Sequence, residues 1–203
     1  MKLLTLALVG LISLSCSRTL KRDYKVVDAS KEEVPEWVED LDEWLDDEED
    51  EKEFKSHRYF TFSTEAKNSQ SISCEIAKAR SVATVASEIS TFIKENLSLS
   101  THGDPTKSDQ KLNEYVESDL KKDVQSYVVG AQVYKTYWEK RRFLKDEGAA
   151  KNWDGYVCTS LIKVPKKNLQ AALDRVEKKL NAKASTSTKT QVAKIIKDAK
   201  EKF

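Results

Sequence analysis

The chain has 203 residues, of which 34% are charged and 39% hydrophobic, so it is long enough for one domain of ordinary size and hardly for two. Its formal net charge of +1 conceals an asymmetry, because residues 31–55 carry a net charge of −11 and residues 163–203 carry +8. The overall charge therefore excludes neither acidic nor basic partners.

The N-terminus has the features of a bacterial export signal. A short cationic head is followed by an apolar run from Leu3 to Leu14. This run is too short for a membrane-spanning helix, which needs about 20 apolar residues. No later segment of the chain is apolar enough to span a bilayer. Ser13-Leu14-Ser15-Cys16 resembles a lipobox, although leucine is commoner than serine at its first position. We therefore predict that residues 1–15 are a lipoprotein signal peptide and that Cys16 receives diacylglycerol and a fatty acid such as palmitate. The alternative is an ordinary secretory signal in which Cys16 has no role.

Residues 16–57 are predicted to be a tether with an acidic segment, since Ser17 to about Asp28 is polar and has no periodic pattern. Apolar residues at helical spacing follow, but the carboxylates among them oppose a helix unless something covers the tryptophans. These residues are Trp37, Leu41, Trp44 and Leu45. The run from Asp46 to Glu51 is interpreted as a solvated linker. A calcium loop would need a glycine turn and spaced ligands, which are missing.

A domain is predicted over residues 58–181. Strands are expected at 58–63, 128–138 and 155–164, helices at 72–97 and 166–180, loops at 98–110 and 139–154, and an ambiguous, short helical segment at 111–126. The order strand-helix-strand-strand-helix predicts an α+β fold. We expect a single small domain with its helices packed on one face of an antiparallel sheet, whose last two strands form a hairpin.

The predicted long helix carries two apolar stripes. The first is taken as its core face and consists of Ile72, Ile76, Ala79, Ala83, Ala86 and Ile93. The second consists of Val82, Val85, Ile89 and Phe92. A helix on a small sheet normally buries one stripe, so we predict that the second is exposed and forms the interface of a homo-oligomer. The alternative is that it is internal and covered by residues 111–126 and the second helix.

Residues 182–203 are predicted to form a basic C-terminal tail helix with Val192, Ile195, Ile196 and Phe203 on one face. One hypothesis is that this face docks on anionic lipid or on the acidic segment of the same or a neighbouring chain. The alternative is a frayed, solvated terminus.

Cysteines and histidines give no pattern of a catalytic or metal site. Cys74 and Cys158 lie in patterned segments without metal-type spacing, and buried thiols are favoured over a disulfide. His57 and His102 are isolated and are interpreted as surface residues, while Asp104, Asp109 and Asp119 are interpreted as ordinary charged-loop carboxylates. No glycine cluster could cradle a phosphate. We therefore expect no enzyme activity, no cofactor and no metal.

The run Lys140-Arg141-Arg142 stands beside aromatic residues, which is one pattern of single-strand nucleic-acid surfaces. Export to the envelope makes nucleic acid an implausible partner. The run is interpreted instead as a strand end whose cations stand in solvent or face the acidic segment.

Four segments in this order resemble the LPP-twenty lipoprotein family. They are Pro35-Glu36-Trp37-Val38, the helix from Glu75 to Ile89, the strand Val128 to Trp138, and Tyr156 to Leu169. The resemblance covers about residues 34 to 180. The chain departs from the family in lacking a glycine after the first strand and in its acidic insertion from Asp40 to Glu53. The resemblance implies a small outer-membrane-associated lipoprotein, in some members tied to flagella or known as a surface antigen, and implies no catalytic residues.

Together these observations predict a lipid-anchored, noncatalytic protein of the outer membrane that faces the periplasm. It is expected to bind other envelope proteins in a structural or assembly role, with flagella as one setting. The alternative is a tethered periplasmic ligand-binding or enzymatic module. A deep pocket with converging polar groups is the feature that would favour this alternative.

Overall fold

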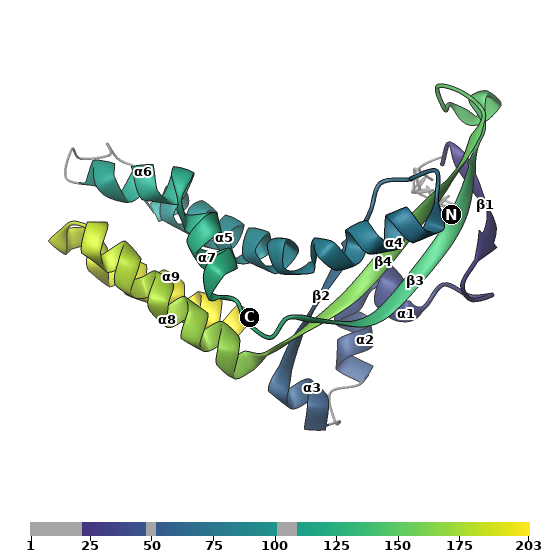
Figure 1. Cartoon of the computed structure of the whole chain (residues 1–203). Helices are drawn as coiled ribbons and strands as arrows, with labels where there is room; N and C mark the ends of the chain where they lie inside the picture. Colours follow the sequence, from purple (N-terminus) through teal and green to yellow (C-terminus); the bar gives the residue numbers. More distant parts are fainter. Residues whose placement is uncertain (1–21, 48–51, 101–108) are drawn as a thin grey trace, which may run out of the picture.

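The structure is a computed structural model that describes residues 22–47, 52–100 and 109–203 (Figure 1). Its strands are β1 (Tyr24–Ala29), β2 (His57–Ser63), β3 (Gln132–Phe143) and β4 (Trp153–Pro165). Its helices are α1 (Glu36–Glu39), α2 (Leu41–Asp47), α3 (Lys52–Ser56), α4 (Gln70–Ala79), α5 (Ser81–Ser100), α6 (Gln110–Ser118), α7 (Leu120–Tyr127), α8 (Lys166–Lys183) and α9 (Thr186–Lys202), with a 3-10 turn at Lys145–Glu147. The predicted α+β class and single small domain are confirmed.

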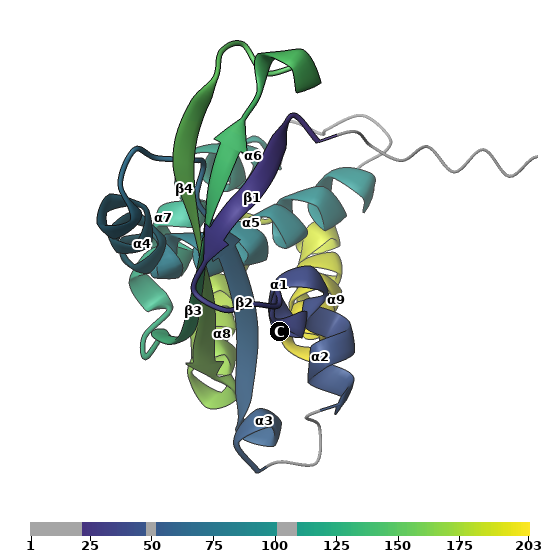
Figure 2. The ribbon, with the colours of Figure 1, turned by 90° about the vertical axis from the view of Figure 1, so that its right-hand side faces the viewer.

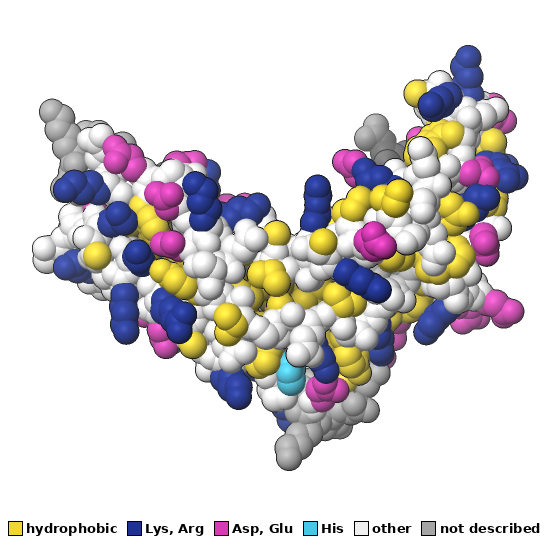
Figure 3. Space-filling view, in the orientation of Figure 1, with side chains coloured by type: hydrophobic (Ala, Val, Ile, Leu, Met, Phe, Trp, Pro, Cys, Tyr) yellow, Lys and Arg dark blue, Asp and Glu magenta, His cyan; other side chains and the backbone are white. Residues whose placement is uncertain are grey.

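Two arms meet at an angle in this domain (Figure 1). The sheet arm consists of the four strands with α1 to α4, and the helical arm consists of α5 to α9. The space-filling view shows a hollow between the two arms (Figure 3). Within the described residues, none of the helices is both long and apolar enough to cross a bilayer.

The sheet is antiparallel throughout and has the strand order β1-β3-β4-β2. The predicted hairpin of the last two strands is present as β3 and β4. The connection predicted over residues 139–154 is shorter than expected and spans residues 144–152, because β3 continues to Phe143 and pairs there with Trp153. The rings of Phe143 and Trp153 stack 4.7 Å apart, and the charged residues before Phe143 find partners within the sheet.

Strand β1 occupies part of the segment that was expected to be an unpatterned tether. Its register places Tyr24 opposite Phe143 and Ala29 opposite Glu139. The ring centroids of Tyr24 and Phe143 are 5.5 Å apart, and the Arg141 guanidinium lies 4.2 Å from the Tyr24 centroid. Such contacts come from a distant strand, so a local pattern could not reveal them. The predicted boundary at residue 58 is therefore too late.

Helices cover both faces of the sheet, not one face as predicted (Figure 2). Helix α4 packs on one face through Ser73 and Ala77, and a disulfide joins Cys74 to Cys158 of β4. This pairing corrects the prediction of two buried thiols. Small side chains on α4 allow the helix to approach the sheet closely enough for the bond, a distance that residue spacing in the sequence could not show.

The described part of the acidic segment forms helices α1 to α3, which cover the opposite face of the sheet. Trp44 packs edge-on against Phe54 and Tyr59, with centroids 5.2 and 5.8 Å away, and the Lys135 ammonium lies 4.8 Å from the Trp44 ring. The tryptophan face is thus buried while the carboxylates of α1 and α2 remain exposed. Asp40 separates the two helices, and its carboxylate accepts backbone N–H groups at the start of α2.

The predicted long helix is divided at Arg80 into α4 and α5. Near this point the Ser81 hydroxyl donates a hydrogen bond of 2.8 Å to the carbonyl of Lys78, a competition with backbone bonding that favours a bend. The division reverses the expected roles of several apolar residues. Ile72 is 53% exposed, whereas Val85 and Ile89 are fully buried.

The helical arm closes on one apolar core. Helix α5 packs against α7 and α9, and α8 packs against α7 and α9. Val192, Ile195, Ile196 and Phe203 of the C-terminal segment are buried in this core. The tail helix is thus an integral part of the domain. Its apolar face is neither frayed nor available to lipid or to the acidic segment.

Candidate functional site

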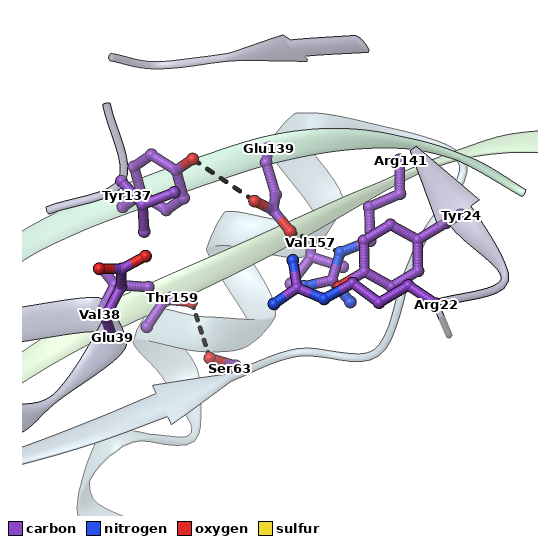
Figure 4. A pocket seen from close by; sticks show the side chains of 11 residues that line it. Arg22, Tyr24, Val38, Glu39, Ser63, Tyr137, Glu139, Arg141, Val157 and Thr159 are labelled. Atoms are coloured by element: carbon purple, nitrogen blue, oxygen red, sulfur yellow. Dashed lines mark hydrogen bonds and ion pairs between the residues drawn. The ribbon is translucent and has the colours of Figure 1, made fainter. Parts of the chain in front are cut away.

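A pocket of about 370 Å³ lies over the sheet face that α1 to α3 only partly cover (Figure 4). Its floor is formed by Tyr137 and Glu139 of β3 and by Val157 and Thr159 of β4, all of which are buried. Because alternate residues of a strand point to the same face, these four side chains necessarily project on the same side. We call this cavity the sheet pocket.

The walls of the sheet pocket carry opposite charges. Arg22, just before β1, and Tyr24, its first residue, form one wall, and Glu39, at the end of α1, belongs to the other. Figure 4 shows the side chains of Arg22 and Arg141 on one side and that of Glu39 on the opposite side. Pro35 precedes the first turn of α1 with φ near −63°, a value its ring imposes, and this start sets the position of the helix.

Glu139 is the central charged group of the floor and is only 8% exposed. Arg141 Nε donates to its Oε1 at 2.5 Å, and the Tyr137 hydroxyl donates a long hydrogen bond of 3.4 Å to its Oε2. Burial, and then the charge of Glu139, raise the pKa of Tyr137 above its ordinary value. Tyr137 therefore stays protonated and acts as a donor at physiological pH.

The floor also holds a pair of hydroxyl groups. Ser63 Oγ and Thr159 Oγ1 lie 2.7 Å apart in a hydrogen bond, and each oxygen retains capacity for another partner. No histidine borders the sheet pocket, and the described part of the chain contains no group of three His, Cys, Asp or Glu side chains able to hold a metal ion. The arrangement suits binding of a polar, charged molecule.

The proposed lipid attachment residue, Cys16, lies outside the described residues, as do His102 and Asp104. His57 is within reach of the Ser56 hydroxyl and the Glu53 carbonyl, at 2.9 and 3.1 Å, and so helps to join α3 to β2. Asp109 accepts hydrogen bonds from the backbone N–H of Ser185 and the hydroxyl of Thr188. It ties the start of α9 to the start of α6.

The predicted oligomer interface is wrong. Val85 and Ile89 are fully buried, while Val82 and Phe92 are partly buried and pack against the same core. Phe92 meets Phe203 edge-on with centroids 5.7 Å apart, so the C-terminal helix covers the stripe that was expected to be exposed. The alternative of an internal stripe holds, but the stripe is covered mainly by α7 and the C-terminal helix α9 and not by the second predicted helix.

The run Lys140-Arg141-Arg142 lies near the end of β3, in keeping with the predicted strand end. Lys140 and Arg142 both pair with Asp154 of β4, with nitrogen–oxygen distances of 3.1 and 3.0 Å, and Arg141 pairs with Glu139. These cations are held against carboxylates of the sheet. Arg142 is also exposed to solvent, as predicted, and Arg141 lines the sheet pocket together with Glu39 of the acidic segment.

An apolar surface on α4 was missed at the level of the sequence. Ile72 and Ala79 are exposed and Ile76 is half-buried, and hydrophobic side chains gather here beside the hollow between the arms (Figure 3). Ile76 also borders a cavity of about 380 Å³ with Phe62 and Arg80. We call Ile72, Ile76 and Ala79 the α4 surface. The small residues Ser73, Cys74 and Ala77 lie on the opposite face of the helix. Their spacing was the feature of the sequence that could have indicated which face packs on the sheet.

Comparison with known proteins gives no assignment: no protein family, no curated protein and no solved structure matches this chain.

Proposed function

We propose that this chain is a lipid-anchored, noncatalytic envelope protein that acts by binding another protein, in a structural or assembly role. The N-terminal segment supports export and lipid attachment, because an apolar run too short to span a bilayer ends at Ser15-Cys16. By its resemblance to the LPP-twenty family and by Ser17, which stands where retained lipoproteins often carry aspartate, the proposed location is the periplasmic side of the outer membrane. Association with flagella is one setting in which such a protein would act.

The disulfide between Cys74 and Cys158 supports export. Disulfides persist in oxidising compartments such as the bacterial periplasm and are rare in the cytosol. The position of β1 also changes the expected geometry of the anchor. Only seven residues, 17–23, separate Cys16 from the first residue of β1. At about 3.5 Å per extended residue, the sheet arm would be held within roughly 30 Å of the lipid.

The α4 surface is the observation that carries the proposal of protein binding. Apolar side chains that are exposed together beside a concave region are typical of protein–protein contact sites. Ile72, at 53% exposed, is the most prominent of them. Its neighbours Glu75 and Lys78 are exposed and polar, so the apolar patch has a charged rim.

Lipidation is tested with the variant Cys16→Ser. Cells that express the wild-type chain are labelled with a radioactive fatty acid and fractionated. The wild type should carry label and sediment with the outer membrane, whereas Cys16→Ser should carry none and be released as a soluble chain. Label on the variant, or wild-type protein found only with the inner membrane, would contradict the corresponding part of the proposal.

Protein binding is tested by photo-crosslinking in living cells. A photoreactive amino acid is placed at Ile72 or Ile76, and at the control positions Lys178 and Lys194, which are exposed on the helical arm. Both α4 positions should capture the same protein, identified by mass spectrometry, and the controls should not. Equal capture at all four positions, or different proteins at Ile72 and Ile76, would argue against a specific site.

A further inference from the structure

We propose that the sheet pocket binds a short peptide of dipeptide size with free amino and carboxyl ends. This inference goes beyond the binding of a partner protein, because it assigns a second site, on the other face of the sheet, to a small ligand. It rests on three features of the pocket, which are its size, its buried polar floor and the opposite charges on its walls.

The size of the sheet pocket suits a small ligand. Its volume of about 370 Å³ is in the range of small-molecule sites, which extends from about 300 to 1,000 Å³. Val38 and Val157 add apolar surface beside the polar groups. A ligand that has a few apolar atoms between charged ends would contact both kinds of surface.

The charges of the pocket select the class of ligand. Two arginines and two glutamates border it, so a purely anionic or purely cationic molecule would meet like charge on part of the lining. Since Arg22 and Arg141 lie opposite Glu39, a molecule with a carboxylate at one end and an ammonium at the other meets an opposite charge at each end. A short peptide with free ends has this distribution.

The arginine side can bind a carboxylate although Glu139 already occupies Arg141. The contact to Glu139 uses Arg141 Nε, and a guanidinium has five N–H donors in a planar fork. Arg22 adds a second guanidinium, which lies 5.9 Å from the centroid of the Tyr24 ring. The same ring also packs against Arg141, so Tyr24 orients both cations.

The floor can recognise the backbone between the two ends of the peptide. The hydroxyls of Ser63 and Thr159 bond to each other and can each form a further hydrogen bond with a peptide group. Glu139 keeps the floor polar and holds Arg141 in place, so it is a positioning residue. Buried polar groups that already have hydrogen-bond partners can line a binding site at little cost in folding free energy.

The experiment is isothermal titration calorimetry of the mature lipoprotein in detergent with a panel of dipeptides, each in four forms. The forms are free, N-acetylated, C-amidated and blocked at both ends. At least one free dipeptide should bind, and blocking either end should weaken binding by about tenfold or more, the loss of one charge-assisted contact. Arg22→Gln should abolish the difference between the free and amidated forms. Glu39→Gln should abolish the difference between the free and acetylated forms.

Two exposed residues outside the pocket give matched control variants, Lys25→Gln and Asp40→Asn, which should leave all four affinities unchanged. The proposal is overturned if no free dipeptide binds at millimolar concentration, if blocked peptides bind as tightly as free ones, or if the controls weaken binding as much as the pocket variants. These outcomes are independent of the crosslinking experiment, since the α4 surface lies on the opposite side of the sheet.

Discussion

The sheet arm and the helical arm are stabilised by different means. The helical arm buries aliphatic side chains from five helices in one core, which includes Ile93, Leu112 and Leu173. The sheet arm contributes Phe60, Ile162 and Val164 to the same core and relies in addition on an aromatic cluster around Trp44, on ion pairs along β3 and on the disulfide. The sheet arm buries the charged Glu139 beside Thr159 on one open face, whereas buried Asp109 of the helical arm is bonded to Ser185 and Thr188. The candidate pocket lies over Glu139 and Thr159, on a face that the helices only partly fill.

The tryptophans make the two arms distinguishable in solution. All four of them, Trp37, Trp44, Trp138 and Trp153, belong to the sheet arm. Tryptophan fluorescence thus reports on the sheet arm, whereas far-ultraviolet circular dichroism is dominated by the helices, most of which form the helical arm. Coincident transitions would show that the arms unfold together.

The largest expected effect is the loss of the disulfide. The bond closes a loop with a sequence separation of 84 residues, which includes α5, α6 and α7 of the helical arm. In the chain-entropy description a loop of this length contributes about 4.5 kcal/mol to the free energy of unfolding. Cys74→Ala combined with Cys158→Ala should lose about that amount in urea titrations. A reductant should lower the stability of the wild type similarly and leave the double variant unchanged.

A smaller but still large effect is expected in the helical core. Ile93→Ala removes a fully buried side chain and should lower the free energy of unfolding by about 3 kcal/mol. Ile72→Ala is the matched control, because it makes the same chemical change at an exposed position and should cost less than about 0.5 kcal/mol. Similar losses for the two variants would mean that α4 buries Ile72 after all. The variant Ile72→Ala is also expected to reduce partner capture at the α4 surface.

Much of the fold could be predicted from local patterns. The aromatic alternation of 58–63 and the alternating segments before Trp138 and after Gly155 do form strands, and the residues after Pro165 do form a helix. These elements carry a strong period, and each has one clearly buried side. The hairpin could be predicted because its two strands are adjacent in the chain.

The remaining features depend on contacts between distant segments. β1 pairs with residues more than a hundred positions away, and the tryptophans of the acidic segment are buried only because Tyr59 and Tyr137 lie beneath them. Of the candidate site, the sequence indicated neither the pairing of Arg141 with Glu139 nor the approach of Arg22 to Tyr24. Such alignments require strand register, which a period of two along one strand does not specify.

The smallest effect expected is a pH dependence at the tip of the sheet arm. Hydrogen bonds from Arg142, then from Lys140, lower the pKa of Asp154 to about 2, whereas an aspartate in an unfolded chain has a pKa of about 3.9. Ionised Asp154 therefore stabilises the native state above about pH 4, and this contribution is lost as the pH falls from about 4 through about 2. Because its side chain is about one-third exposed, water and salt screen the interaction and the effect on stability is small.

Asp154→Asn tests this dependence. The variant should be slightly less stable than the wild type at neutral pH, and the difference should fade as the pH falls from about 4 through about 2 and shrink in high salt. Unfolding followed by tryptophan fluorescence is the suitable measurement, since Trp153 adjoins the ion pair in β4. Asp146→Asn, a change in the loop of the same hairpin, is the control and should leave stability unchanged at both pH values. A difference for Asp154→Asn that does not diminish between about pH 4 and pH 2 would show that the side chain contributes through packing, because most of the charge contribution is lost over this range.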